Sequence, residues 1–147
     1  MELRKMQSQD EALFIDMATE FYASEVVSHK IPIEHMRRAF QEVVSDNPFV
    51  DALFICHEKQ EVGYALLGYT YSMEAGGKIA ILDEFFILPD FRRLRLGSQV
   101  LETLSKNREA DVVAIRLEIV TGNEGLQKFY EKNGYQMMGY SAMIKAL

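Results

Sequence analysis

The stretch Asp83-Glu-Phe-Phe-Ile-Leu-Pro-Asp-Phe-Arg-Arg-Leu-Arg-Leu-Gly97-Ser98 contains the end of a strand, a turn and the start of a helix. Pro89 ends the strand, because proline has no backbone N–H to donate to a sheet. A helix is predicted from Leu96, and the first N–H groups of a helix have no intrahelical partners. Together with the helix dipole, these groups form an anion site, and Gly97 lets a ligand approach the backbone closely.

Three arginines at the same turn, Arg92, Arg93 and Arg95, add positive charge beside the predicted helix start. A ligand with several phosphate charges is the occupant that this combination favours. The alternative is a solvated basic turn before an ordinary helix. The turn by itself does not separate the two interpretations.

A second stretch, Asn123-Glu-Gly-Leu-Gln-Lys-Phe-Tyr130-Glu-Lys-Asn-Gly134-Tyr135, predicts a helix over residues 124–133. Gly134 stands where a helix commonly ends, because glycine adopts the left-handed conformation that closes the last turn. Taken alone, Tyr130 is an ordinary amphipathic core residue of this helix.

Together the two stretches resemble the GNAT N-acetyltransferases. The first is similar to their signature Arg/Gln-x-x-Gly-x-Gly/Ala, with Arg92 and Gly97 in register and Arg95 in place of the first glycine. The second is similar to the pattern Asn-x-x-Ala-x-x-Phe/Leu-Tyr-Glu-x-x-Gly-Phe/Tyr, with Leu126 at the alanine position. The resemblance covers residues 62–140. Arg95 must either accept the backbone geometry of the glycine or shift the loop.

The resemblance implies that acetyl-CoA is the cosubstrate. The strand would offer backbone groups to the pantetheine arm, and the turn would hold the pyrophosphate. The implied cofactor-binding residues are Phe85, Phe86, Ile87, Arg92, Arg93, Leu94, Arg95, Leu96, Gly97, Ser98, Asn123 and Tyr130. Tyr130 would also protonate the departing thiolate, since a tyrosine with an ordinary pKa of about 10 is a proton donor near neutral pH.

Acetyl transfer to an amine also needs a base, because an amine acceptor is protonated in water. Glu84 is the first choice for this base or for a group that orients the acceptor, and Asp83 is the second. These carboxyls lie in an apolar strand, where an unpaired charge is costly, and alternation predicts that they point to opposite faces. For each, the alternative is a structural pairing with an arginine. Weaker candidates for the acceptor pocket are Tyr22, His29, Tyr71 and Glu74.

The formal net charge of −6 argues against nucleic acid or an anionic membrane as a partner. It fits a small cationic amine, and the segments 63–71 and 82–87 resemble the diamine or polyamine acetyltransferase branch. The single cysteine cannot form an internal disulfide, and no apolar run reaches the ~18 residues of a membrane helix. We therefore expect a cytoplasmic protein. No metal site is expected, because the histidines lack metal-ligand spacing.

The predicted function is acetyl transfer from acetyl-CoA to a primary amine by direct attack in a ternary complex. Two alternatives stay open: a non-catalytic acyl-CoA-binding regulatory module, which Arg95 motivates, and an acetyltransferase that acts on a protein amine. The resemblance also carries a family expectation of a homodimer.

The hydrophobic pattern predicts one domain over residues 1–147 with a mixed α+β fold. We expect a mostly antiparallel sheet of about six strands flanked by about four helices. Strands are predicted at residues 2–6, 52–57, 62–73, 79–88, 112–120 and 135–144. Helices are predicted from Ser8, with Glu11 at capping-box spacing, and over residues 33–44, 96–106 and 124–133.

Overall fold

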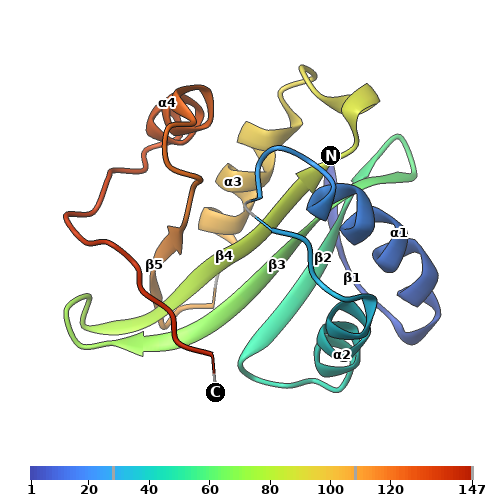
Figure 1. Cartoon of the computed structure of the whole chain (residues 1–147), viewed down its shortest axis with the longest axis horizontal. Helices are drawn as coiled ribbons and strands as arrows, with labels where there is room; N and C mark the ends of the chain where they lie inside the picture. The colour runs from blue at the N-terminus through green and yellow to red at the C-terminus, as the bar shows by residue number, and fades with distance from the viewer. Residues whose placement is uncertain (28, 108, 147) are drawn as a thin grey trace.

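The computed structural model describes residues 1–27, 29–107 and 109–146. The elements are β1 (Glu2–Lys5), η1 (Ser8–Asp10), α1 (Glu11–Tyr22), α2 (Ile33–Val44), β2 (Val50–His57), β3 (Gln60–Ser72), β4 (Gly77–Ile87), η2 (Pro89–Phe91), α3 (Leu96–Lys106), β5 (Val112–Leu117) and α4 (Glu124–Lys132). Figure 1 shows α1 and α2 beside the β1 edge of the sheet, whereas α4 stands near β5 at the other edge.

The sheet runs in the order β1-β2-β3-β4-β5. The strands β1 to β4 pair with one another in antiparallel fashion, whereas β4 and β5 are parallel. A parallel pair needs a crossover connection, which α3 supplies. The predicted α+β class and mostly antiparallel sheet are therefore confirmed.

The prediction of a sixth strand over residues 135–144 is wrong, and the fifth strand ends at Leu117 rather than at residue 120. From Met137 on, the C-terminal segment leaves its large apolar side chains in solvent, with Met143 and Ile144 98% and 99% exposed. The β propensity of a segment is realised when its side chains pack on a neighbouring strand and a core. Among the described residues, only Tyr135 at the start of this segment packs on a core and no strand pairs with it, so the segment forms no strand.

Two hydrophobic cores lie on the two faces of the sheet. One packs α1 and α2 against the sheet and is rich in aromatic rings, including Phe14, Phe21, Phe40, Tyr64 and Phe86. The other packs α3 and Tyr130 of α4 against the opposite face. Residues of β4 contribute to both cores, so this strand separates two differently built environments.

Gly63 on β3 is required by the close approach of β4. A Cβ at this position would lie 2.1 Å from the carbonyl oxygen of Phe86, closer than any side chain allows. Because that contact is with backbone, a side chain here would have to separate the two strands. The glycine therefore fixes the end of β4 against β3.

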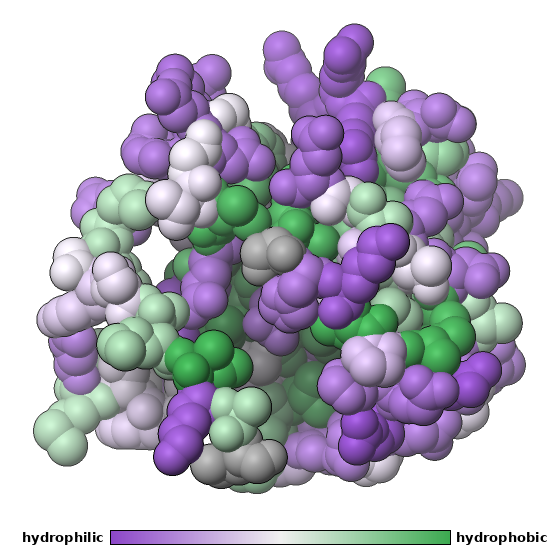
Figure 2. Space-filling view, in the orientation of Figure 1, coloured by the Kyte–Doolittle hydropathy of each residue, from purple (hydrophilic) through white to green (hydrophobic). Residues whose placement is uncertain are grey.

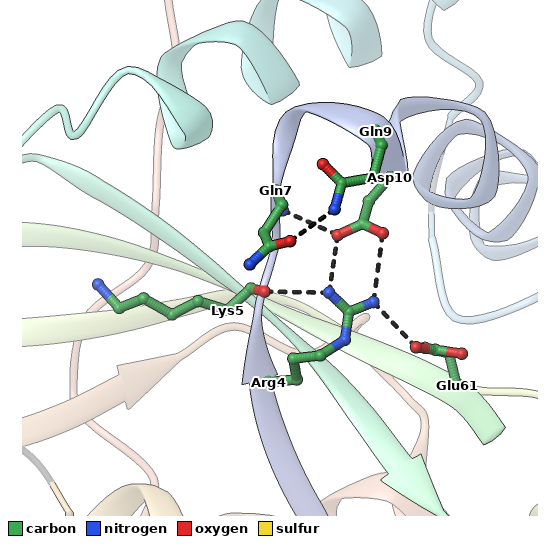
Figure 3. Close-up of polar contacts among 6 residues, drawn as sticks. All are labelled: Arg4, Lys5, Gln7, Gln9, Asp10 and Glu61. Atoms are coloured by element: carbon green, nitrogen blue, oxygen red, sulfur yellow. Dashed lines mark hydrogen bonds and ion pairs between the residues drawn. The ribbon is translucent and has the colours of Figure 1, made fainter. Parts of the chain in front are cut away.

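At the N-terminal edge, Arg4 links β1, η1 and β3 through two carboxylates (Figure 3). Its guanidinium donates to Asp10 Oδ2 at 2.8 Å and to Glu61 Oε1 at 2.9 Å. Asp10 also accepts from the backbone N–H of Gln7 at 2.8 Å. The first helical turn is therefore capped by Gln7 and Asp10, and the predicted capping pair of Ser8 and Glu11 is wrong.

Among the described residues, no helix combines the length and the apolar character that crossing a membrane requires.

Candidate active site

The strands β4 and β5 pair along only part of their length. The pairing joins Lys78–Leu82 to Val112–Leu117, and β4 then continues to Ile87 paired only with β3. Within the described residues, the edge of β4 from Asp83 to Ile87 that faces β5 therefore has no strand partner. Free backbone groups along a strand edge can pair with an extended ligand. This edge contains Phe85, Phe86 and Ile87, the residues predicted to meet a pantetheine arm.

A β-bulge lies where the two strands part. Leu66 of β3 pairs with Glu84, whereas the next residue, Leu67, pairs with Leu82, so Asp83 is the extra residue. An inserted residue reverses which face each later side chain occupies. Before the bulge, Leu82 belongs to the α3 core, whereas after it Phe86 belongs to the core under α1 and α2.

The bulge thus turns Glu84 toward the α1–α2 layer. Its carboxylate accepts from the Tyr22 hydroxyl at 2.6 Å on Oε1 and from the Tyr64 hydroxyl at 2.5 Å on Oε2. Glu84 is 8% exposed, and among the described residues it is the one charged side chain that is buried. The two hydroxyls come from the end of α1 and from β3, so the pairing with an arginine that was the alternative for Glu84 is not formed.

Burial dominates the electrostatics of this cluster. Desolvation raises the pKa of Glu84, and the hydrogen bonds from Tyr22 and Tyr64 oppose part of that rise. The pKa of each tyrosine is raised in turn, mainly by burial and by the neighbouring Glu84 carboxylate. A carboxyl with an elevated pKa and two fixed hydrogen bonds has the character of a general base.

Asp83 occupies a different environment. It is exposed at the bulge, and partial desolvation together with the charge of Glu118, just beyond β5, raises its pKa. Asp83 and Glu84 therefore place two carboxyls where β4 and β5 separate, and Glu118, which lies 4.0 Å from the Arg116 guanidinium, adds a third. This potential favours a cationic molecule at that point.

The turn after β4 keeps the geometry of the glycine that the signature expects. Arg95 is the N-cap of α3 and adopts a left-handed backbone, with φ 59° and ψ 15°. Arg93 also has a positive φ, 69°. Such a conformation costs a non-glycine residue about 1–2 kcal/mol. Arg95 therefore accepts the strained backbone and does not shift the loop.

The three arginines of this turn differ in their contacts. The Nε of Arg92 donates to the carbonyl oxygen of Ile87 at 2.9 Å, and its guanidinium lies 5.7 Å from the ring centroid of Phe86. Arg93 and Arg95 are exposed, and no described carboxylate lies within ion-pair distance of either. Arg92 thus fastens the turn to β4, while the other two cations face solvent.

The first turn of α3 combines a buried leucine with a closely packed glycine. Leu96 is 2% exposed, so its side chain belongs to the core and only its backbone can meet a ligand. A Cβ at Gly97 would lie 3.0 Å from Phe129 of α4 and 3.8 Å from Phe85. A shallow pocket between α3 and α4 is lined by Ser98, Leu101, Glu102, Ser105, Lys132 and Asn133. Leu94 is exposed in the turn itself.

On α4, Asn123 serves first as a helix cap. Its Oδ1 accepts from the backbone N–H of Leu126 at 3.0 Å, which leaves its amide NH₂ for another contact. Gly134 has a positive φ of 88°, as expected for a residue just after a helix end.

Tyr130 lies in the α3-side core, 8% exposed, with the rings of Phe129 and Tyr135 packed edge-on against it. Burial, followed by the neighbouring Tyr135, raises the pKa of Tyr130 to about 12, so its hydroxyl is protonated at neutral pH. The hydroxyl of Tyr135 is buried and has no hydrogen-bond partner among the described residues. A bound ligand would supply one.

The weaker acceptor-pocket candidates are dispersed. Tyr22 joins Glu84, whereas His29 is exposed in the connection between α1 and α2. Tyr71 is 75% exposed, and Glu74 follows it in the β3–β4 turn, where it accepts from the Tyr140 hydroxyl at 3.5 Å. Tyr71 is five residues along β3 from Leu66, the partner of Glu84, or about 17 Å at the usual rise per strand residue.

Three residues of this region were not among the sequence-based candidates: Tyr64, Glu118 and Tyr135. Tyr64 belongs to an aromatic-rich strand that reads as ordinary core. The pairing of Leu66 with Glu84 shows that Tyr64 lies two residues from the partner of Glu84 on the neighbouring strand. The register of β3 against β4 was the missing information, and the bulge at Asp83 makes that register hard to infer.

Comparison with known proteins identifies the family of this chain. A sequence profile of the acetyltransferase (GNAT) domain matches residues 50–137, more than half of the chain. The chain therefore belongs to the GNAT acetyltransferase family. Membership supports the prediction of acetyl-CoA as the cosubstrate.

Solved structures share the fold over nearly the whole chain. An integron cassette protein from the mobile metagenome of Cole Harbour Salt Marsh is 26% identical, with a TM-score of 0.80 over 99% of this chain and 90% of that one. A possible acetyltransferase from Clostridium difficile 630 is 13% identical, with a TM-score of 0.85 over 99% and 97%. AAC(6')-Iy, solved with the bisubstrate analogue CoA-S-monomethyl-acetylneamine, is 12% identical, with a TM-score of 0.80 over 99% and 97%.

The described residues fit a CoA molecule in two respects. The N-terminus of α3 offers backbone N–H groups beside the two cations Arg93 and Arg95, which have no described ion-pair partner, and an orphaned tyrosine hydroxyl lies near Tyr130. Together with the open edge of β4, these features cover the phosphate and amide chemistry of such a ligand.

Proposed function

We propose that this protein transfers the acetyl group of acetyl-CoA to the primary amine of a small cationic acceptor. The observation that supports it most strongly is the Glu84 cluster at the separation of β4 and β5. A buried carboxylate held by two hydroxyls, with its pKa raised, is suited to take a proton from an ammonium group. The carboxyls of Asp83 and Glu118 favour a cation nearby.

When bound, acetyl-CoA supplies an activated acetyl thioester. On the cofactor side, we propose that the backbone from Phe85 to Ile87 holds the pantetheine arm. The turn from Arg92 to Ser98 holds the pyrophosphate, and the free amide NH₂ of Asn123 contacts the cofactor arm. The pKa of Tyr130, raised to about 12, keeps its hydroxyl protonated at neutral pH, and Tyr130 donates this proton to the leaving sulfur.

On the acceptor side, Glu84 is the proposed base and Asp83 orients the incoming cation. This assignment follows their environments, because the carboxyl of Glu84 is fixed and buried, whereas that of Asp83 is exposed. The acidic surroundings also suit a diamine or polyamine, the branch that segments 63–71 and 82–87 resemble.

The test measures thiol release from acetyl-CoA with a panel that contains a simple monoamine, diamines, polyamines, an aminoglycoside and a peptide with a free N-terminus. We expect turnover with small amines and the highest kcat/KM with a dication or polycation. Tyr130→Phe should lower kcat about tenfold or more and leave acetyl-CoA binding unchanged, because the ring still packs.

Tight acetyl-CoA binding without turnover on any amine would instead favour a non-catalytic module, and turnover on the peptide alone would favour a protein acceptor. The glycine-like backbone of Arg95 removes the reason for expecting a defective loop. Catalysis is therefore the better proposal of the two.

A further inference from the structure

The Glu84 carboxylate is largely enclosed by the core. Glu84 is 8% exposed, and each carboxylate oxygen already accepts a tyrosine hydroxyl. Burial therefore leaves an acceptor amine outside the core little direct access to Glu84, because both carboxylate oxygens lie against tyrosine hydroxyls. A proton can still arrive through a hydroxyl that is bonded to the carboxylate on one side and open on the other.

The two tyrosines differ in this respect. Tyr64 is 0% exposed, with the rings of Phe14, Phe21 and Phe86 around it. Tyr22 is the last residue of α1 and is half-buried, at the start of the connection to α2. Of the two hydroxyls bonded to Glu84, only that of Tyr22 belongs to a residue with access to solvent.

Building on the proposed function, we propose that Tyr22 is a catalytic residue that relays the acceptor's proton to Glu84. The ammonium of the acceptor gives one proton to the Tyr22 oxygen, while the Tyr22 hydroxyl proton moves to Oε1 of Glu84. The step leaves a neutral amine, a protonated Glu84 and an intact tyrosine. Tyr64 holds the other carboxylate oxygen and passes no proton.

The electrostatics agree with a relay in which Tyr22 never becomes a free anion. Burial and the Glu84 charge raise the pKa of Tyr22, so its hydroxyl holds a proton throughout the neutral range. The titratable groups that face Glu84 are Tyr22 from α1, Tyr64 from β3 and Asp83 from β4, and the charge of Asp83 raises the pKa of Glu84 further. A protonated Glu84 is therefore an accessible product of the relay.

The experiment compares Tyr22→Phe with Tyr64→Phe, because each removes one hydroxyl from the same carboxylate. Both enzymes are assayed with a strongly basic alkylamine and with a weakly basic amine that is uncharged at the assay pH. We expect Tyr22→Phe to lower kcat/KM about 100-fold for the basic amine and only a few-fold for the weakly basic one. Tyr64→Phe should lower kcat/KM for the basic amine far less than Tyr22→Phe does, because Tyr64 passes no proton and only helps to hold Glu84 in place.

One further measurement separates a relay from a structural role, and two more check the variants. A proton inventory of the wild-type enzyme in mixtures of H₂O and D₂O needs no variant and should curve, because two protons move together. In ¹³C NMR of the carboxyl groups, Tyr22→Phe should raise the pKa of Glu84, the signal being assigned with Glu84→Gln. Thermal unfolding of both variants reports whether the fold is kept.

An equal loss on both amines, or a linear inventory, overturns the relay and leaves the proposed function standing. Absence of wild-type turnover on every amine overturns the proposed function and the relay with it.

Discussion

Two carboxylate clusters in this protein are built in opposite ways. Asp10 and Glu61 share the guanidinium of Arg4, at hydrogen-bond distances of 2.8 and 2.9 Å (Figure 3). Glu84 has only neutral hydroxyls as partners and lies deeper, at 8% exposure. In the first cluster, the positive charge of Arg4 compensates the two carboxylates directly. The second keeps an uncompensated carboxylate in the core, which a purely structural site would avoid.

The two clusters should give opposite contributions to stability as pH changes. The hydrogen bond from Arg4 lowers the pKa of Asp10, so its contribution is present above the unfolded-state pKa and is lost as pH falls through the folded value. Burial raises the pKa of Glu84, so folding is favoured below its unfolded pKa and that contribution is lost as pH rises through the folded value. Near neutral pH, ionised Asp10 therefore stabilises the fold, whereas the buried Glu84 carboxyl destabilises it.

The largest expected effect comes from Glu84→Gln, which keeps the shape of the cluster and removes its base. We expect kcat on a basic amine to fall about 100- to 1,000-fold, because general-base catalysis contributes factors of this order. In the wild type, kcat/KM should rise with pH through a pKa above the ordinary 4.5 of glutamate, and the variant should lack this limb. Steady-state kinetics from acid to mildly alkaline pH measure both effects.

Asp83→Asn is the matched control, since it changes the neighbouring carboxyl to its amide on the exposed side of the bulge. Its kcat should fall less than tenfold, with a higher KM for cationic acceptors. A larger fall in kcat for Asp83→Asn than for Glu84→Gln would reverse the proposed roles.

Most of the fold follows from sequence pattern, because helices and inner strands carry their own periodicity. The helices over 33–44 and 96–106 have the predicted bounds. The strand predicted over 135–144 rests on apolar composition rather than on regular alternation, and no strand of the described residues lies beside the segment to pair with it. Local pattern states what a segment can form, and the sheet decides whether a place exists for it.

The site was predictable where a motif has local geometry and unpredictable where it depends on register. The turn before α3 follows from Pro89, Gly97 and the arginines. The left-handed backbone of Arg95 is one of the two alternatives that the sequence predicts, the other being a shifted loop. The partners of Glu84 depend on a single inserted residue at Asp83. Simple alternation would have put Glu84 on the face of Leu82, away from Tyr22 and Tyr64.

A middle-sized effect should come from breaking the compensated cluster. Arg4→Met leaves Asp10 and Glu61 without their cation, and we expect the free energy of unfolding at neutral pH to fall by about 2 kcal/mol. The loss should shrink on acidification, as both carboxyls become protonated. Chemical unfolding followed by circular dichroism measures it, and kcat of the folded enzyme should stay unchanged, because β1 is at the opposite sheet edge from β5.

The control is Lys5→Met, which removes a neighbouring cation that is 75% exposed and lies 3.7 Å from Asp51. Such an ion pair is screened by water, so its loss should change the free energy of unfolding by less than about 0.5 kcal/mol. Equal losses for the two variants would mean that the arrangement around Arg4 adds nothing beyond surface charge.

The smallest expected effect concerns Arg95, an exposed cation that pairs with no described carboxylate. Arg95→Gly relieves the left-handed backbone, and after the greater flexibility of the unfolded chain is subtracted, the fold should gain about 1 kcal/mol. If the guanidinium meets the cofactor's phosphates, the same variant should bind acetyl-CoA about fivefold more weakly, with a shallower dependence on salt. Arg95→Ala separates the two effects, because it removes the charge and keeps the strain: binding should weaken as in the glycine variant, without the gain in stability. Unchanged affinity in both variants, measured by calorimetry, would mean that the strained arginine serves no phosphate and that the backbone of the turn binds alone.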